Sequence, residues 1–177
     1  MIISVEKAKT LIDFNGWTDD KIKMKLKAVE QTIRAYTNNN FQVRGYRVRA
    51  SITDGVLMPE SAAVPFALDD TVQISDSQLN NGIYTVISAD DTSFMVSDDL
   101  KDEKSVLVTK IVYPADVIDC CVNLLEWERE HRAKVGIQSE TLSRHSVTYF
   151  NMDGANSMMG YPVSLLGCLK AYRKARF

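Results

Sequence analysis

The chain has 177 residues, of which 45% are hydrophobic and 25% are charged, and its formal net charge is −2. This composition allows one packed domain, or a small domain that carries an insertion, and it excludes a wholly disordered chain. No apolar run approaches the roughly 20 residues of a membrane-spanning helix, and the first residues lack the apolar stretch of a signal peptide. We therefore expect a protein that is made and kept inside a cell and that binds no membrane.

Charge is unevenly distributed along the chain. Residues 50–103 contain eleven acidic residues and one lysine, a net charge of −10, whereas residues 1–49 and 104–177 are both net basic. This distribution indicates two modules, an acidic one between two basic flanks.

The first 37 residues predict two helices. Ser4 is a plausible N-cap for the first, Gly16 fits a left-handed stop, and one apolar face is formed by Val5, Ala8, Leu11 and Ile12. The second helix covers residues 18–37 with Thr18 as its cap, and its apolar face is formed by Ile22, Leu26, Val29, Ile33 and Tyr36. The lysines at positions 21, 23, 25 and 27 spread over the remaining surface. They fit either a solvated helix face or a site for an acidic partner.

From Phe41 to Pro114 the apolar period changes to two, which predicts strands. The strand segments are YRVRA, VQIS, GIYTVIS, SFMVS and VLVTKIVY, and Asn81-Gly82 and ADDT are turn signals between them. Most acidic residues of this region fall in turns, where they solvate loops. Because they lack the pattern of a calcium-binding loop, we expect no metal site.

Helical periodicity returns after Pro114 and predicts a helix over residues 115–134, with Val117, Cys121, Leu124 and Leu125 facing inward. Pro162 fits the first turn of a last helix, whose inward residues are Val163, Leu166, Leu169 and Tyr172. The three cysteines have the spacing of neither a disulfide framework nor a metal site, so we expect small buried side chains.

These elements predict an α+β fold. Four helices form a mostly α-helical frame from residues 1–41 and 113–177, and a small antiparallel β module is inserted at residues 42–112.

Ser143, His145 and Ser146 raise the question of a serine nucleophile. Neighbouring residues of a strand point to opposite faces, so His145 is not placed to activate Ser146, and Ser143 lies outside any nucleophile-elbow motif. The chain also has no phosphate-loop, dinucleotide or zinc-protease motif. We therefore predict a strand over residues 144–150 and a protein without catalytic residues, cofactor or metal.

The segments SETL (139–142), SVTY (146–149) and the Pro-led segment 162–177, which ends in YRKARF, follow one another in a familiar order. Together they resemble the C-terminal region of head–tail connector (adaptor) proteins of tailed bacteriophages. The helices over residues 19–37 and from residue 114 resemble the same family, although this chain has YTNNN where the family usually ends in YTGR. Residues 41–112 depart from the minimal family pattern but are similar to β inserts in connectors of phages that infect Gram-positive hosts.

The resemblance implies a structural protein with no enzyme activity. Such proteins form a ring, usually of twelve subunits, that docks beneath the portal, extends the DNA channel and offers a platform to the next neck, stopper or tail protein. DNA passes through without sequence-specific binding. The implied location is the neck of the virion, assembled in the cytoplasm of the host bacterium.

The resemblance also assigns a site, because the C-terminal segment of such proteins reaches the portal. Carried over to this chain, the portal or subunit interface consists of Leu169, Tyr172, Arg173, Lys174, Arg176 and Phe177. Basic and aromatic residues are frequent in interface hot spots, although the residues alone equally fit a frayed basic tail.

Two questions stay open at the level of sequence. The short Asn-Gly turn between the first helices would also suit a small helix-turn-helix DNA-binding regulator, although the basic residues do not gather on one helix. A third possibility is a stopper ring, but such proteins are usually β-rich throughout, and the predicted helical frame argues against this class. The acidic loop residues Asp90, Asp91, Asp98 and Asp99 either face the DNA channel or lie on an outer rim, where they solvate loops or meet a basic partner.

Overall fold

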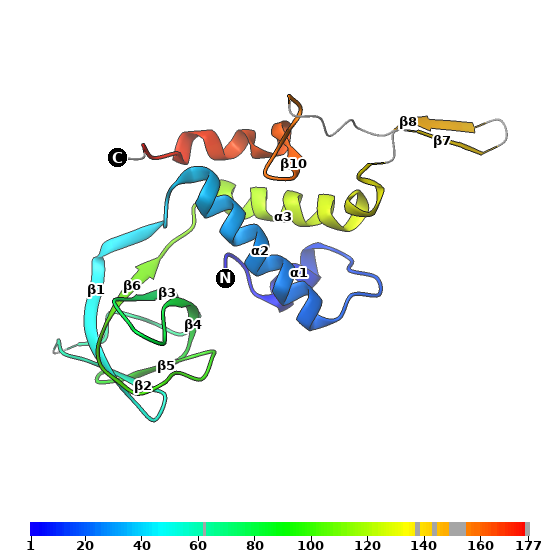
Figure 1. Cartoon of the computed structure of the whole chain (residues 1–177). Coiled ribbons are helices and arrows are strands. Elements are labelled where there is room, and N and C mark those ends of the chain that lie inside the picture. Colours follow the sequence, from blue (N-terminus) through cyan, green and yellow to red (C-terminus); the bar gives the residue numbers. More distant parts are fainter. Residues whose placement is uncertain (62, 137–138, 143–144, 149–154, 176–177) are drawn as a thin grey trace. The chain divides into compact units, whose positions relative to one another are not determined.

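The computed structural model describes residues 1–61, 63–136, 139–142, 145–148 and 155–175. The chain separates into two compact units, one of Met1 and Asn40–Tyr113, the other of Ile2–Asn39 and Pro114–Phe177. The first unit is built from strands and the second mainly from helices (Figure 1).

Six antiparallel strands of the first unit close into a barrel in the order β1-β2-β5-β4-β3-β6. The strands are β1 (Gln42–Thr53), β2 (Val56–Pro59), β3 (Thr71–Ser75), β4 (Gly82–Ala89), β5 (Phe94–Val96) and β6 (Glu103–Ile111). Closure depends on β6, which pairs with β1 on one side and with β3 on the other. A closed barrel leaves no sheet edge open to other chains.

Alternate residues of the barrel strands point inward and form one core. Phe94 of β5 is 1% exposed, and its ring packs edge-on against Phe66 with the centroids 5.0 Å apart. The other core residues are Ala50, Ile52, Leu57, Val72, Ile74, Val86, Val96, Leu100, Val106 and Val108. Phe66 and Leu100 come from loops, whereas the core residues within the strands recur with a period of two, the pattern that predicted strands in this region.

The expected fold class, a mostly α-helical four-helix frame with a small β module, is wrong. The β region is a closed six-stranded barrel, and the helical unit has three α-helices among its described residues. Five of the barrel strands were predicted, but β2 was missed. Closure was missed because it depends on the pairing of β6 with β1 and β3, strands that lie far away in the sequence.

The helical unit contains α1 (Val5–Leu11), α2 (Asp19–Thr37), α3 (Ala115–Glu130) and two 3-10 helices, η1 (Arg132–Lys134) and η2 (Val163–Tyr172). The two predicted N-caps are confirmed, because the side chains of Ser4 and Thr18 accept hydrogen bonds from backbone amides in the first turns of α1 and α2. No helix among the described residues has the length and apolar character needed to cross a membrane.

The apolar faces of α2 and α3 form the core of this unit. The confirmed inward residues are Ile22, Leu26, Val29, Ile33, Val117, Cys121, Leu124 and Leu125. Tyr36 is only half-buried, and Leu11, the last residue of α1, is 48% exposed. α1 ends with Ile12 as its C-cap rather than at Gly16. The cysteine prediction holds for Cys120 and Cys121, whereas Cys168 is exposed.

Two short antiparallel pairs belong to this unit. β7 (Ser139–Leu142) pairs with β8 (His145–Thr148), and β9 (Ser157–Met158) pairs with β10 (Tyr161–Pro162). The strand prediction over 144–150 is confirmed for β8, and its other positions lie outside the described residues.

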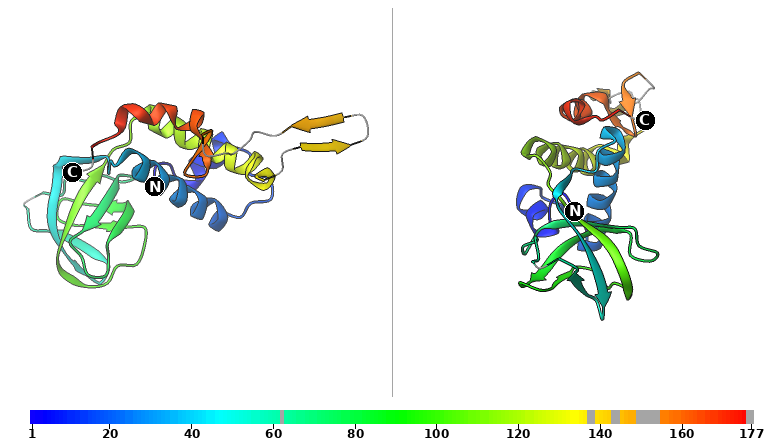
Figure 2. Two further views of the ribbon diagram at one scale, coloured as in Figure 1. Left: turned by 45° about the horizontal axis from the view of Figure 1, so that its top comes forward. Right: turned by 90° about the vertical axis from the view of Figure 1, so that its left-hand side faces the viewer.

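The last predicted helix has 3-10 rather than α geometry, and it runs alongside α3 (Figures 1 and 2). Its inward residues are spaced by three, at positions 163, 166, 169 and 172. A 3-10 helix has three residues per turn, so this spacing aligns the four side chains on one face. Leu166 and Leu169 are fully buried on that face.

Candidate protein-binding interface

The C-terminal segment after η2 is bound to the end of α2 through its backbone. The amide of Lys174 donates to the carbonyl of Thr37 at 2.8 Å. The side-chain amide of Asn38 donates to the carbonyl of Ala175 at 3.1 Å, and that of Asn39 to the carbonyl of Tyr172 at 3.3 Å. The described part of this segment is therefore held on the helical unit and is not a frayed tail.

Asn38 has two roles at this contact. It is the C-cap of α2 and adopts a left-handed conformation with φ of 47°, which asparagine tolerates better than most residues. Its side chain then reaches the C-terminal segment. The sequence analysis ended the second helix at residue 37 but missed this second role of Asn38, although short amides are frequent partners of backbone groups.

Two side-chain contacts fix the segment further. The hydroxyl of Tyr172 lies 2.7 Å from both carboxylate oxygens of Asp116, at the start of α3, and this hydrogen bond raises the pKa of Tyr172. The guanidinium of Arg173 lies 5.3 Å from the ring centroid of Tyr36, within cation–π range.

A pocket of about 440 Å³ opens beside these contacts. It is lined by Ala35, Tyr36, Asn38, Met158, Met159, Arg173, Lys174 and Ala175. Met158 and Met159 are 46% and 48% exposed, so the pocket combines an apolar wall with two basic side chains. This combination fits a protein segment with apolar and acidic side chains, because methionine adapts its shape to its partner.

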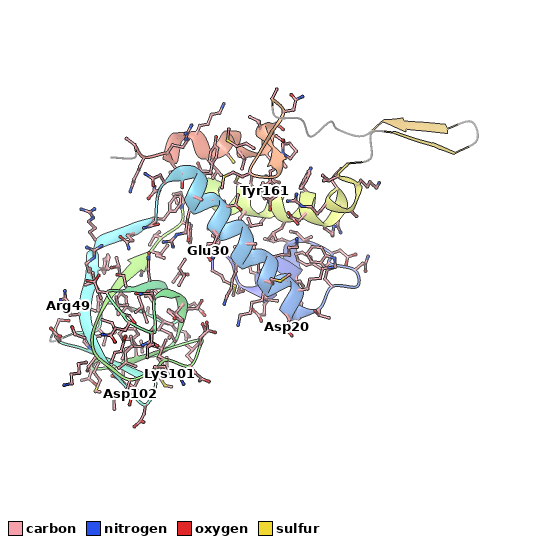
Figure 3. All side chains as sticks on the ribbon, in the orientation of Figure 1. Asp20, Glu30, Arg49, Lys101, Asp102 and Tyr161 are labelled. Carbon is pink, nitrogen blue, oxygen red and sulfur yellow. The ribbon has the colours of Figure 1, made fainter. Side chains whose placement is uncertain are left out.

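The methionine wall is held by a charged cluster around Glu128 of α3. Glu128 is 5% exposed and accepts hydrogen bonds from Lys25 of α2 at 2.6 Å and from Nε of Arg132 at 2.8 Å. Arg132 also donates to the carbonyl of Gly160, next to Met159, at 2.9 Å. The guanidinium of Arg132 lies 5.0 Å from the ring of Tyr161, which is labelled in Figure 3.

Electrostatics keeps this cluster ionised. Burial acts to raise the pKa of Glu128, but the hydrogen bonds from Arg132 and Lys25 outweigh burial and lower it to about 2. Burial, reinforced by the charge of Glu128, raises the pKa of Tyr161. The sequence analysis did not single out Glu128 as a buried residue. Its place in the repeat 117, 121, 124, 128 was the signal that could have found it.

The predicted interface residues differ in how far the structure buries them. Leu169 is fully buried, so its side chain supports η2 from within the helical unit. Tyr172 is half-buried, while Arg173 and Lys174 are exposed. Arg176 and Phe177 lie outside the described residues.

The four acidic loop residues flank β5. Asp90 accepts hydrogen bonds from the backbone and side chains of Thr92 and Ser93, which lower its pKa to about 2 and make it the organising residue of the β4–β5 turn. Asp91 is exposed in the same turn. Asp98 and Asp99 follow β5, and the charge of Asp98 adds to burial in raising the pKa of Tyr84.

Among the described residues, no cluster of three or more His, Cys, Asp or Glu side chains could hold a metal ion. Of the residues considered for a serine nucleophile and its base, Ser143 lies outside the described residues, and His145 and Ser146 are consecutive residues of β8. A comparison with protein-family models and with curated proteins gave no match.

Proposed function

We propose that this chain is a structural protein of a bacteriophage neck, a head–tail connector that acts without catalysis. In this role, copies of the chain form a ring, of twelve subunits in the virion, that docks on the portal and extends the DNA channel. The ring then offers a platform to the next neck or tail protein.

The observation that carries the proposal is that the C-terminal segment is held in place by specific contacts with the helical unit. Backbone groups of the segment make three hydrogen bonds to residues at the end of α2, and Tyr172 makes a further one to Asp116 of α3. A frayed terminal tail would not make such contacts. These contacts support a role in which Arg173 and Lys174 are presented in a fixed position beside the methionine wall. The order of sequence motifs shared with the connector family supports the same role.

The portal contact is tested with Arg173→Glu and the matched control Lys170→Glu. Both positions are exposed and both changes reverse one charge, but only Arg173 lines the pocket. We expect R173E to weaken binding to purified portal rings of the encoding phage by about tenfold or more, and K170E to leave binding nearly unchanged. Biolayer interferometry and electron microscopy of the mixture report the two outcomes. Equal binding by wild type and R173E contradicts the assigned contact, and no binding by the wild type contradicts the proposed function.

A DNA-binding regulator gives a different result in the same preparation. Duplex DNA titrated against the wild-type chain would then bind with an affinity that falls steeply with salt. Two of the helical-unit lysines are engaged in ion pairs, Lys25 with Glu128 and Lys9 with Asp19, which does not favour a recognition helix. We therefore expect no salt-dependent duplex binding.

A further inference from the structure

The outer face of the barrel carries an apolar patch made of Val56, Met58, Ile87 and Met95. Met58, Ile87 and Met95 are 41%, 51% and 40% exposed. None of the three belongs to the barrel core, which is formed by other residues. In the strand register Val56 lies directly opposite Met95, and Met95 lies opposite Ser88, next to Ile87. The four side chains therefore belong to three neighbouring strands, β2, β5 and β4.

A β-bulge contributes to this patch. The pairing of β4 with β5 shifts between Val86 and Ser88, which leaves Ile87 as the extra residue. A bulge re-aims a side chain and is common beside functional sites. Here Val86 stays fully buried while the bulged Ile87 is half-exposed on the outer face.

Acidic residues flank the patch at both ends of β5. Asp90 and Asp91 lie in the turn before this strand, and Asp98 and Asp99 follow it. Asp91 and Asp99 are exposed. The patch is therefore an apolar surface with an acidic rim, which fits a partner surface with an apolar centre and a basic rim.

The helical unit has a surface of that kind on α2. A groove of about 430 Å³ is lined by Asp20, Lys23, Met24, Lys27, Ala28 and Gln31. Met24 is 60% exposed, and the small side chain of Ala28 leaves room beside it. Asp20, labelled in Figure 3 at the start of α2, is the one acid among the lining residues. Two of the four lysines of this helix, Lys23 and Lys27, therefore form a basic rim on the groove.

We propose that the acidic-rimmed barrel patch of one copy of this chain binds the lysine-rimmed α2 groove of a second copy. The two surfaces are different, so the contact is heterologous, and heterologous contacts generate rings when the rotation between subunits closes. That these contacts close into a ring rests on the proposed function. The contact between two copies can form without the portal. In this assignment the acidic loops face a neighbouring subunit rather than the DNA channel.

The contact is tested by the self-association of the full chain at low salt. Sedimentation velocity from about 10 μM to about 1 mM should show concentration-dependent association of the wild type, a range suited to weak contacts. Met95→Lys and Met24→Glu should each raise the dissociation constant by about tenfold or more. The matched controls are Leu68→Lys on the barrel and Leu11→Glu on the helical unit, which lie outside both surfaces and are 62% and 48% exposed. These controls should associate as the wild type does.

Charge reversal gives a second, independent test of the contact. Asp91→Lys with Asp99→Lys should weaken association, as should Lys23→Glu with Lys27→Glu, because each reverses one rim. A chain that carries all four changes has complementary rims again and should recover most of the association. Circular dichroism checks that each variant is folded.

Three results overturn the contact. They are a wild type that stays monomeric at about 1 mM and low salt, controls that lose as much association as M95K and M24E, and a fourfold variant that recovers nothing. None of these results depends on portal binding, so a failure of this contact is distinguishable from a failure of the proposed function.

Discussion

Two carboxylates, Glu128 and Asp90, have pKa values lowered to about 2 for different physical reasons. Glu128 is buried, and two cationic side chains, Lys25 and Arg132, compensate for its lost hydration. Asp90 is in water and accepts four hydrogen bonds within its own turn. Only the buried carboxylate ties separate helices together, so we expect only Glu128 to have a large effect on the stability of its unit.

Glu128→Gln should lower the free energy of unfolding of the helical unit by about 3 kcal/mol at pH 7. The folded-state pKa is about 2 and the ordinary value is 4.5, so this contribution is present above pH 4.5 and is lost as the pH falls towards 2. The difference between wild type and variant should therefore shrink over that interval. Urea titrations followed by tryptophan fluorescence measure it, because Trp17 and Trp127 both belong to the helical unit.

The control is Glu126→Gln, two residues away on the same helix and less buried than Glu128. A pH-independent difference for E128Q, or an equal loss for E126Q, would show that the charge of Glu128 is not the source of the stability.

At the scale of single elements, the geometry of η2 explains why Leu169 is buried while the other described residues assigned to the interface are more exposed. Residues three apart on a 3-10 helix share a face, so Leu169 packs inward with Leu166 while the residues after Tyr172 stay accessible. The same element thus supplies a buried anchor and presents basic residues at its end.

Leu169→Ala should destabilise the helical unit by about 2 to 5 kcal/mol, because the removed side chain is fully buried. Cys168→Ala, at the exposed neighbouring position, should change stability by less than about 0.5 kcal/mol. Thermal and urea unfolding measure both variants. If L169A keeps wild-type stability but loses portal binding, the side chain contacts the partner directly and its burial is not its role.

At the scale of the whole molecule, the chain has two units with separate cores. The barrel core contains the Phe66–Phe94 pair, and the helical core is formed by the apolar faces of α2, α3 and η2. A core mutation in one unit should therefore leave the core of the other unit intact.

Phe94→Ala should destabilise the barrel by about 3 to 5 kcal/mol, because it empties a fully packed site on a three-residue strand. Hydrogen exchange of barrel amides measures this loss, while tryptophan fluorescence should report an unchanged transition of the helical unit. Met95→Ala, the exposed neighbour on the same strand, is the control and should change barrel stability little. Coincident shifts of both readouts would mean that the units unfold together.

Features that depend on neighbouring residues could be predicted from the sequence. The caps at Ser4 and Thr18 bond to amides three positions away, and the apolar face from Ile22 to Ile33 follows from helical periodicity. Five barrel strands were likewise visible from their alternation. The basic and aromatic end of the chain was visible too, and its assignment to an interface stays a proposal.

Contacts between residues that are distant in the sequence could be seen only in the folded chain. Barrel closure joins β1 to β6, the ion pair of Lys25 with Glu128 joins residues 103 positions apart, and the contact of Asn38 with Ala175 joins residues 137 positions apart. Local pattern carries no information on such pairs, because periodicity reports which face of an element is buried but not which element buries it. Leu169 shows the difference. Periodicity predicted that it faces inward and the resemblance assigned it to an interface, and the structure shows that its side chain is fully buried in the helical unit.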